Sequence, residues 1–398
     1  MLYVLTGEVR YVMSIGYKYD HTCYTIMQQL RYFLTVIEMG FNLKPVAVLM
    51  LSTLTLLANG EPQVPCYFVF GDSLMDNGNN NYLVTQAKVN YPPYGIDFPD
   101  GPTGRFSNGR NIADVIAELL GFKSYIPPFA TANGEQIISG VNYASGAAGI
   151  LEETGQHMGA RISLDKQIQN HWITILRLSY LIGKGSLATT KKYLNECIYT
   201  IGMGNNDYIN NYFAPKYYKT STLYTPEQYA EVLIEQYSKQ LQALYKYGAR
   251  KFGIFAAGYT GCTPGMMKEY GVNSCVDSVN YAVILFNTLL NATLNDLNNK
   301  YADAKFIIID SPLGYSNDLN VTDVPCCEVS STYAKGNCAP NQIPCSNREN
   351  YVFWDAYHPT EKVSIIDGTA AYETLSPLYS SEIISSSTDN GSGYISDI

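Results

Sequence analysis

Short apolar runs alternate with helix-length segments along most of the chain, and this alternation restricts the fold more than any other feature. The apolar runs have the aromatic and β-branched residues typical of buried strands and occupy residues 64–70, 140–150, 197–207, 251–258 and 305–310. Patterns of helical period occupy residues 111–120, 163–182, 226–246 and 277–299. This order predicts an α/β protein with a central parallel sheet that is covered by helices on both faces.

Three segments with polar residues lie at the expected carboxyl ends of the strands in these runs. They are Asp72-Ser73, Ala144-Ser145-Gly146 and Asn205-Asn206-Asp207. In open parallel sheets, ligands bind outside the carboxyl ends of the strands. We therefore expect the functional site at this edge of the sheet.

Four histidines are present, and they limit the choice of a base that works at neutral pH. His157 lies in a glycine-containing loop and His171 lies in a helical pattern, so surface or packing roles are the simpler interpretation of both. His358 instead follows Asp355 by three residues in the turn WDAYHPT. A carboxylate at this spacing can bond one ring nitrogen and leave the other free as a base.

Ser73 is a candidate nucleophile because it follows a buried-type strand, although a helix N-cap is an alternative interpretation of the same residues. The chain has no G-x-S-x-G motif, so the usual α/β-hydrolase arrangement is not supported. Donors for an oxyanion are the Asn206 side chain and the backbone N–H groups of Gly146 and Gly149. An asparagine-rich turn and a tightly packed glycine turn are the alternative interpretations of these two segments.

The N-terminal part has the features of a secretory signal. Residues 44–60 contain a lysine, an apolar run and small residues near a cleavage point, and the run is too short to span a bilayer. We expect translation to start at Met39, so that residues 1–38 are a non-native extension and 39–60 a signal peptide. Residues 61–398 then form a single domain with a loose C-terminal tail. A native extension with a buried apolar segment is the alternative.

Four motifs occur in a fixed order: F-G-D-S-L, N-Y-A-S-G-A-A-G-I, G-N-N-D and W-D-A-Y-H-P-T. Further segments between them read DNGNNN, PPYG and GRFSNGR. In this combination the chain resembles the GDSL esterase/lipase family, also called SGNH hydrolases, and in particular its plant branch. The resemblance covers roughly residues 64–365.

The resemblance implies a flavodoxin-like three-layer α/β/α sandwich with a central parallel sheet of about five strands. It implies that Ser73 is the nucleophile, that His358 is the general base and that Asp355 orients the base. It also implies an oxyanion hole, whose donors are the N–H of Ser73, the N–H of Gly149 or else Gly146, and the side chain of Asn206. Ester cleavage would then proceed through an acyl-enzyme intermediate.

The cysteines favour an oxidising compartment. Nine are present, of which Cys23 lies in the presumed N-terminal extension and the other eight form an even set. Sequons at Asn291, Asn320 and Asn390 agree with secretion. Cys66 and Cys197 precede strands that should be neighbours, so we expect them to pair. The cysteines lack zinc-type spacing, and we expect neither a metal nor a cofactor.

The leading hypothesis is a secreted, extracellular, monomeric hydrolase that cleaves small-molecule or lipid esters. The formal net charge of −9 argues against a nucleic-acid partner, and we expect no integral membrane span. A secreted binding or storage protein without activity is one alternative. A glycosidase that uses paired carboxylates is a second alternative, and the sequence singles out no such pair.

Overall fold

We describe the architecture from a computed structural model, which covers residues 60–310, 319–332 and 334–380. The expected extension (1–38), nearly all of the expected signal peptide (39–60) and the end of the C-terminal tail lie outside the described residues. The chain from Glu61 onward forms one compact unit, and the expected division into extension, signal peptide and single domain stays a prediction.

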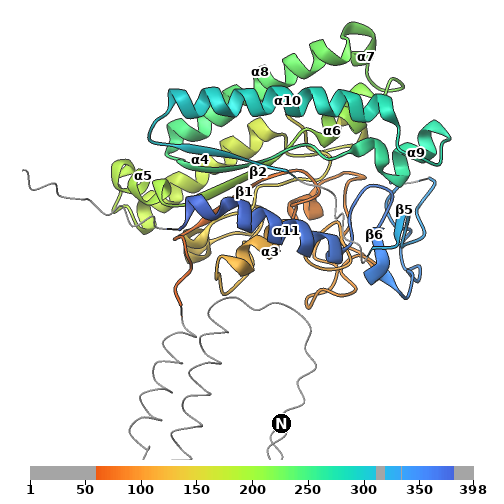
Figure 1. Cartoon of the computed structure of the whole chain (residues 1–398). Coiled ribbons are helices and arrows are strands. Elements are labelled where there is room, and N and C mark those ends of the chain that lie inside the picture. The colour runs from red at the N-terminus through yellow and green to blue at the C-terminus, as the bar shows by residue number, and fades with distance from the viewer. Residues whose placement is uncertain (1–59, 311–318, 333, 381–398) are drawn as a thin grey trace, which may run out of the picture. The chain divides into compact units, whose positions relative to one another are not determined.

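The central sheet contains four parallel strands in the order β1-β2-β3-β4 (Figure 1). Their bounds are β1 Tyr67–Gly71, β2 Ile198–Gly202, β3 Lys251–Phe255 and β4 Lys305–Ile309. The segment after Gly140 lies along the free side of β1, where Tyr143 N–H donates to Val69 O at 2.7 Å and Ser145 N–H donates to Gly71 O at 3.0 Å. This segment takes the place of a fifth strand, and the resulting order is that of a flavodoxin-like sheet.

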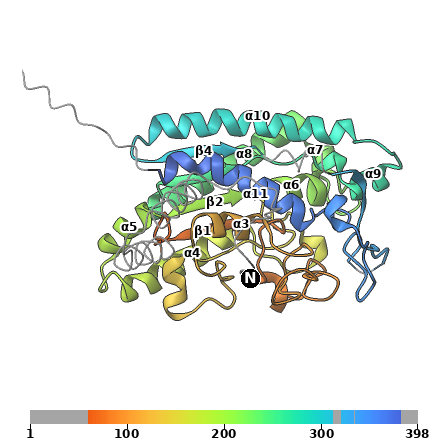
Figure 2. The same ribbon diagram turned by 60° about the horizontal axis from the view of Figure 1, so that its bottom comes forward.

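Helices cover both faces of the sheet, as the sequence predicts. One layer contains α4 (Leu164–Leu181), α5 (Leu187–Asn195), α8 (Pro226–Tyr247) and α10 (Asp277–Lys300), and the other contains α3 (Ile112–Leu119) and α11 (Glu361–Leu375) (Figures 1 and 2). Because side chains alternate along a strand, Phe68 and Phe70 of β1 face the first layer, whereas Tyr67 and Val69 face the second. The α/β/α sandwich is therefore confirmed.

Three of the long helices, α3, α4 and α8, begin at residues whose side chains cap the first turn. Asn111 and Asp114 form a reciprocal capping box at the start of α3. Ser163 caps α4, and Thr225 caps α8 immediately before a proline at the first helical position. The predicted helices match the observed ones to within a residue or two, and for these three the caps explain where the helix begins.

The other helical segments are short and lie in connections. They are η1 (Asn79–Tyr82), η2 (Gly134–Ser139), η3 (Gln156–Met158), α6 (Asn205–Asp207), η4 (Tyr208–Tyr212), α7 (Thr220–Leu223), η5 (Thr260–Cys262), α9 (Pro264–Tyr270), η6 (Arg348–Asn350) and η7 (Ser376–Leu378).

A second, two-stranded parallel sheet pairs β5 (Val321–Pro325) with β6 (Tyr351–Phe353). The cysteine-rich stretch between these strands is closed by the disulfides Cys326–Cys345 and Cys327–Cys338. The stretch is therefore a long loop that two bridges hold closed.

Two further disulfides differ in the length of chain that they close, 13 and 131 positions. Cys262 pairs with Cys275. Cys66 pairs with Cys197, which confirms the expected bridge between the segments that lead into β1 and β2.

Candidate active site

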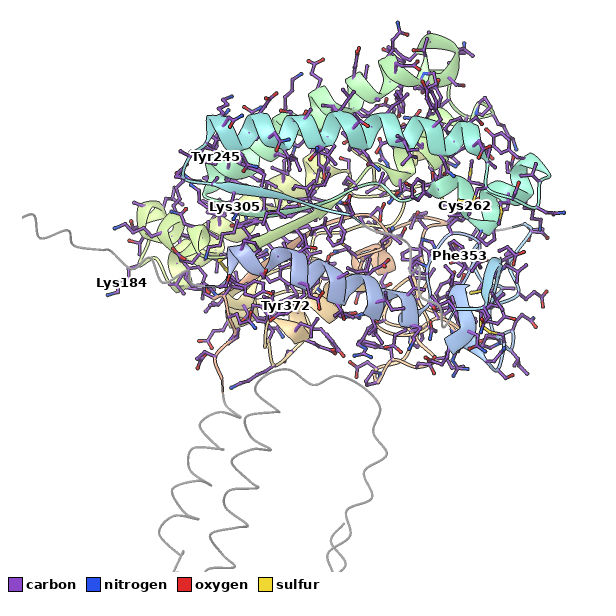
Figure 3. All side chains as sticks on the ribbon, in the orientation of Figure 1. Lys184, Tyr245, Cys262, Lys305, Phe353 and Tyr372 are labelled. Carbon is purple, nitrogen blue, oxygen red and sulfur yellow. A yellow bond between two sulfur atoms is a disulfide. The ribbon has the colours of Figure 1, made fainter. Side chains whose placement is uncertain are left out.

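The candidate site lies at the carboxyl edge of the central sheet. In Figure 3 this is the side of Cys262 and Phe353, whereas Lys305 marks the start of β4 and the other side. Ser73 follows β1, Asn206 follows β2, and His358 follows β6. Segments that are far apart in the sequence therefore meet at the edge that the strand ends predict.

Ser73, His358 and Asp355 form one chain of hydrogen bonds. His358 Nε2 lies 2.8 Å from Ser73 Oγ, and His358 Nδ1 lies 2.9 and 2.8 Å from the two carboxylate oxygens of Asp355. Asp355 is fully buried, and small fractions of Ser73 and His358, 7% and 8%, are exposed. The carboxylate fixes the Nδ1–H tautomer, so that Nε2 is free to accept the serine proton.

Side-chain hydrogen bonds hold the backbone on both sides of Ser73. The side chain of Gln167, from α4, both accepts from Gly71 N at 3.0 Å and donates to Gly71 O at 2.9 Å. Asp72 accepts the N–H of Leu74 at 2.9 Å, which closes a turn around the serine. Ser73 thus lies in a turn after β1 and does not cap a helix, and the next helical segment is η1.

The turn that carries Asp355 and His358 is held by its own backbone. Asp355 Oδ1 accepts the N–H groups of Tyr357 and His358, both at 2.8 Å. The N–H of Trp354 donates to His358 O at 2.8 Å. The Phe106 ring packs against the imidazole with a centroid distance of 4.7 Å. These contacts define the position of the ring from several sides.

Asn206 presents a side-chain amide to the same cleft. Its Nδ2 donates to Ala148 O at 3.0 Å, and its Oδ1 accepts from Asn210 Nδ2 at 2.7 Å. An amide nitrogen has two donor protons, so a second proton is available to a bound substrate.

In the glycine-rich turn after Ser145, Gly146, Ala147 and Gly149 differ in their contacts. Gly146 donates its N–H to Asp76 Oδ2 at 3.2 Å. A Cβ added to Gly149 would lie 2.4 Å from Thr154 Cγ2, so this glycine permits close packing. Ala147, between them, lines the cleft and has the left-handed φ of 63°. The sequence gives no signal for Ala147, because this conformation is uncommon for alanine.

Three buried aspartates, Asp72, Asp76 and Asp207, lie next to the site. Burial raises the pKa of Asp72 to about 6, although the N–H of Leu74 and the nearby His358 lower it. Burial also raises the pKa of Asp76 and of Asp207 to about 6, against several hydrogen bonds that lower it. Asp207 accepts the N–H groups of Ile150 and Leu151 and thereby anchors the glycine-rich turn beside Asn206.

The cleft above these residues has a volume of about 410 Å³. Much of its wall is apolar and includes Leu74, Met75, Phe106, Met158, Phe213 and Met266. An ion pair between Lys335 and Glu269, at 2.8 Å, also borders it. Such a mainly apolar cleft with a few polar groups at one end is typical of sites for small organic molecules.

The remaining described histidines lie apart from this hydrogen-bonded chain. His157 borders the cleft, where its Nδ1 lies 3.1 Å from the Tyr218 hydroxyl. His171 is fully buried among aromatic rings, and burial lowers its pKa to about 3. His171 is thus a packing residue, as its helical pattern indicates.

The structure describes residues 60–310, 319–332 and 334–380. Within these ranges, no group of three or more His, Cys, Asp or Glu side chains is arranged to hold a metal ion. None of the helices in the same ranges is long and apolar enough to cross a membrane.

Comparison with known proteins gives consistent matches. The family model described as GDSL-like lipase/acylhydrolase matches residues 67–366. The GDSL esterase/lipase At1g29670 of Arabidopsis thaliana is 49% identical over 329 residues, which cover 80% of this chain and 90% of the relative. The GDSL esterase/lipase At5g45670 of the same plant is 45% identical over 333 residues, or 81% of this chain and 91% of the relative.

Among solved structures, the chain is similar to Est24, a carbohydrate acetylesterase from Sinorhizobium meliloti. The two are 12% identical with a TM-score of 0.34, over 79% of this chain and 99% of that one. Similarity at this level supports no inference about substrate.

Proposed function

Since the chain belongs to the GDSL-like lipase/acylhydrolase family and is a carboxylic ester hydrolase, we propose that Ser73, His358 and Asp355 are its catalytic triad. The observation that carries the proposal is the distance of 2.8 Å between Ser73 Oγ and His358 Nε2. The family assignment favours this reading over a storage protein or a glycosidase.

In the first half of the reaction, Ser73 Oγ attacks the ester carbonyl carbon while His358 Nε2 takes the hydroxyl proton. Asp355 stabilises the resulting imidazolium. The tetrahedral intermediate then collapses, and the C–O bond to the alcohol breaks. His358 returns the proton to the leaving alcohol, and the acyl group stays on Ser73.

In the second half, water replaces the alcohol. His358 takes a proton from the water molecule as its oxygen attacks the acyl carbon. Collapse of the second tetrahedral intermediate releases the carboxylic acid and returns the proton to Ser73. The atoms of ester and water are thus divided between acid and alcohol without a cofactor.

We propose that the oxyanion of both intermediates is stabilised by the N–H of Ser73, the side chain of Asn206 and a backbone N–H of the glycine-rich turn. Gly149 is the donor that the family resemblance implies, and Gly146 is the alternative. The N–H of Gly146 already donates to Asp76, which counts against it. The place of Ala147 on the cleft wall makes its own N–H an additional candidate.

We also propose that the enzyme is secreted and acts outside the cell. The four disulfides among the described cysteines support this proposal, because such bridges persist in oxidising compartments. The apolar part of the cleft wall supports an ester substrate with an apolar acyl or alcohol group.

The test is hydrolysis of p-nitrophenyl butyrate by the wild-type protein and by Ser73→Ala. We expect the variant to lose nearly all turnover, and a fluorophosphonate probe to label the wild type but not the variant. Ser107→Ala, at a buried serine outside the triad, is the matched control and should keep both activity and labelling. Undiminished turnover in Ser73→Ala would disprove the proposed nucleophile.

A further inference from the structure

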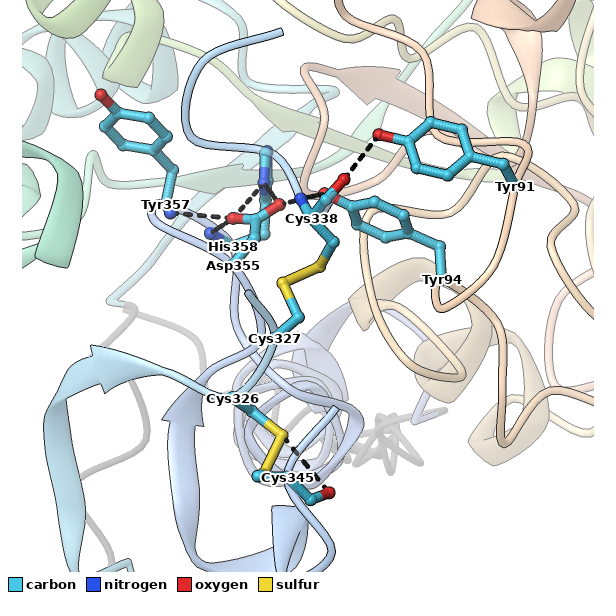
Figure 4. Close-up of a disulfide and its surroundings, with 9 residues drawn as sticks. All are labelled: Tyr91, Tyr94, Cys326, Cys327, Cys338, Cys345, Asp355, Tyr357 and His358. Carbon is cyan, nitrogen blue, oxygen red and sulfur yellow. Dashed lines mark hydrogen bonds and ion pairs between the residues drawn. A yellow bond between two sulfur atoms is a disulfide. The ribbon is translucent and has the colours of Figure 1, made fainter. Parts of the chain in front are cut away.

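A buried phenol contacts the triad carboxylate independently of the histidine. The Tyr94 hydroxyl donates to Asp355 Oδ2 at 2.6 Å and accepts the N–H of Cys338 at 3.0 Å (Figure 4). Tyr94 is 1% exposed and Asp355 is fully buried, so water does not compete for this bond. A hydrogen bond of this length to a carboxylate is charge-assisted and stronger than one between neutral groups.

We propose that Tyr94 is a positioning residue of the triad, which holds Asp355 Oδ2 toward His358 and weakens the attraction between the carboxylate and the imidazolium. The inference rests on the proposed catalytic roles of Asp355 and His358. Its physical basis is that both Tyr94 and His358 Nδ1 donate to the same oxygen. Each donor disperses part of the negative charge of the Asp355 carboxylate. The Tyr94 phenol therefore reduces the charge that attracts the His358 imidazolium.

Tyr94 stays a donor throughout the working pH range. Burial raises the pKa of Tyr94 well above its ordinary value, and the charge of Asp355 raises it further. The phenol therefore keeps its proton, and the bond has one direction: from Tyr94 to the carboxylate.

The position of Tyr94 is fixed by aromatic packing. Its ring meets the rings of Tyr91 and Phe106 edge to face, with centroid distances of 5.5 and 6.4 Å. Phe106 also packs on His358. The Phe106 ring therefore packs against both Tyr94, which holds the carboxylate, and His358, which the carboxylate orients.

The cysteine-rich loop also holds Tyr94 in place, through hydrogen bonds at Cys338. Tyr91 donates its hydroxyl proton to Cys338 O at 3.0 Å, while Tyr94 accepts the N–H of the same residue (Figure 4). Cys338 is bonded to Cys327, whose N–H donates to Trp354 O at 3.0 Å. The loop therefore joins Tyr94 to the residue immediately before Asp355.

Other titratable groups around the pair are present in both the wild type and Tyr94→Phe. Asp72 faces His358 from the end of β1, and its pKa responds to the histidine charge. Tyr357 lies beside Asp355, and Glu269 of α9 acts on its phenol. A change in pH dependence on loss of the Tyr94 hydroxyl can therefore be assigned to Tyr94 itself.

The experiment compares kcat/KM against pH for p-nitrophenyl butyrate in the wild type and Tyr94→Phe. Without the phenol, more of the carboxylate charge acts on the imidazolium, so a higher pH is needed to obtain the neutral base. We expect the midpoint of the acid limb, where kcat/KM rises with pH, to move to higher pH by about half a pH unit to one pH unit. We expect kcat at the plateau to fall by up to about tenfold, with KM nearly unchanged.

Tyr91→Phe is the matched control, because it removes a hydroxyl from the same loop without touching Asp355. Rates are expressed per serine labelled by the fluorophosphonate probe, so partial misfolding lowers the active fraction but not the midpoint. We expect the acid limb of Tyr91→Phe to coincide with that of the wild type. An unchanged acid limb in Tyr94→Phe would overturn the inference.

A second variant serves if Tyr94→Phe does not fold. A fluorotyrosine with a more acidic phenol, introduced at position 94 alone, is a stronger donor and should move the acid limb down. Failure to shift in that direction would also overturn the inference. If Ser73→Ala were fully active, the proposed function would fail instead, so the two failures are distinguishable.

Discussion

The side-chain amide of Asn206 offers the sharpest test of how the site stabilises charge. Substitution of Asn206 by alanine removes one donor from the cleft. Its Nδ2 uses one proton on Ala148 O, so one proton is left for the oxyanion. Ala148 O and the Asn210 amide each lose a hydrogen-bond partner in the variant, so a loss of stability accompanies the loss of rate. Loss of one such donor costs about 100- to 1000-fold in kcat.

The assay is steady-state hydrolysis of p-nitrophenyl butyrate, with kcat and KM determined separately. Since the bond strengthens as charge develops on the carbonyl oxygen, kcat should carry nearly all the loss and KM should change little. Asn206→Asp keeps the size of the side chain but places a carboxylate near the oxyanion, so it should be slower still than Asn206→Ala.

Asn211→Ala is the matched control. Asn211 is fully buried and donates to Thr154 Oγ1 at 3.1 Å, so its loss should lower stability but leave kcat near the wild-type value. A loss below about tenfold in Asn206→Ala, or an effect confined to KM, would refute the role of this amide.

Three further outcomes follow from the packing and charge of the protein. Replacement of Cys66 and Cys197 together by alanine opens a bridge across 131 residues, so urea unfolding should show a loss of about 5 kcal/mol; a loss below about 1 kcal/mol would contradict this. Gly149→Ala places a methyl group 2.4 Å from a Thr154 carbon, and calorimetry should show a lower Tm, equivalent to about 1–3 kcal/mol; an unchanged Tm would count against the packing role. Because burial raises the pKa of Asp76 and Asp207 to about 6, the folded state binds these protons more tightly than the unfolded chain. The free energy of unfolding should therefore rise between pH 7 and pH 5, by about 1 kcal/mol per group, and a decrease over this interval would contradict it.

Much of the fold could be predicted because its signals are local. Strand and helix positions follow from periodicity, and helix starts follow from residues such as Asn111 and Ser163, whose side chains bond the first turn. The order of the four motifs predicted that Ser73 and His358 would meet, and their side chains lie in contact. The pairing of Cys66 with Cys197 followed from the expectation that their strands are neighbours.

Other features depend on contacts between distant residues and have no local signal. The expected strand over 140–150 forms only single bridges to its neighbours, because the chain bends at Gly140, with φ 121°, and at Ala147. The partners of Cys326 and Cys327 could not be deduced, since four cysteines in one loop allow several pairings. Tyr94 stands in the segment PPYG, and its carboxylate partner is 261 positions away, so no local pattern indicates their contact.

The separation of Ser73 and His358, 285 positions along the chain, has a consequence for biosynthesis. Chains emerge from the ribosome N-terminus first, and the strands that present Ser73 and Asn206 are made long before the segment that carries the base. A nascent chain can therefore pair β1 with β2 and still be chemically inert. On the proposed triad, activity is expected only once the turn that carries Asp355 and His358 has been made, and chains cut short before that turn are expected to be inactive.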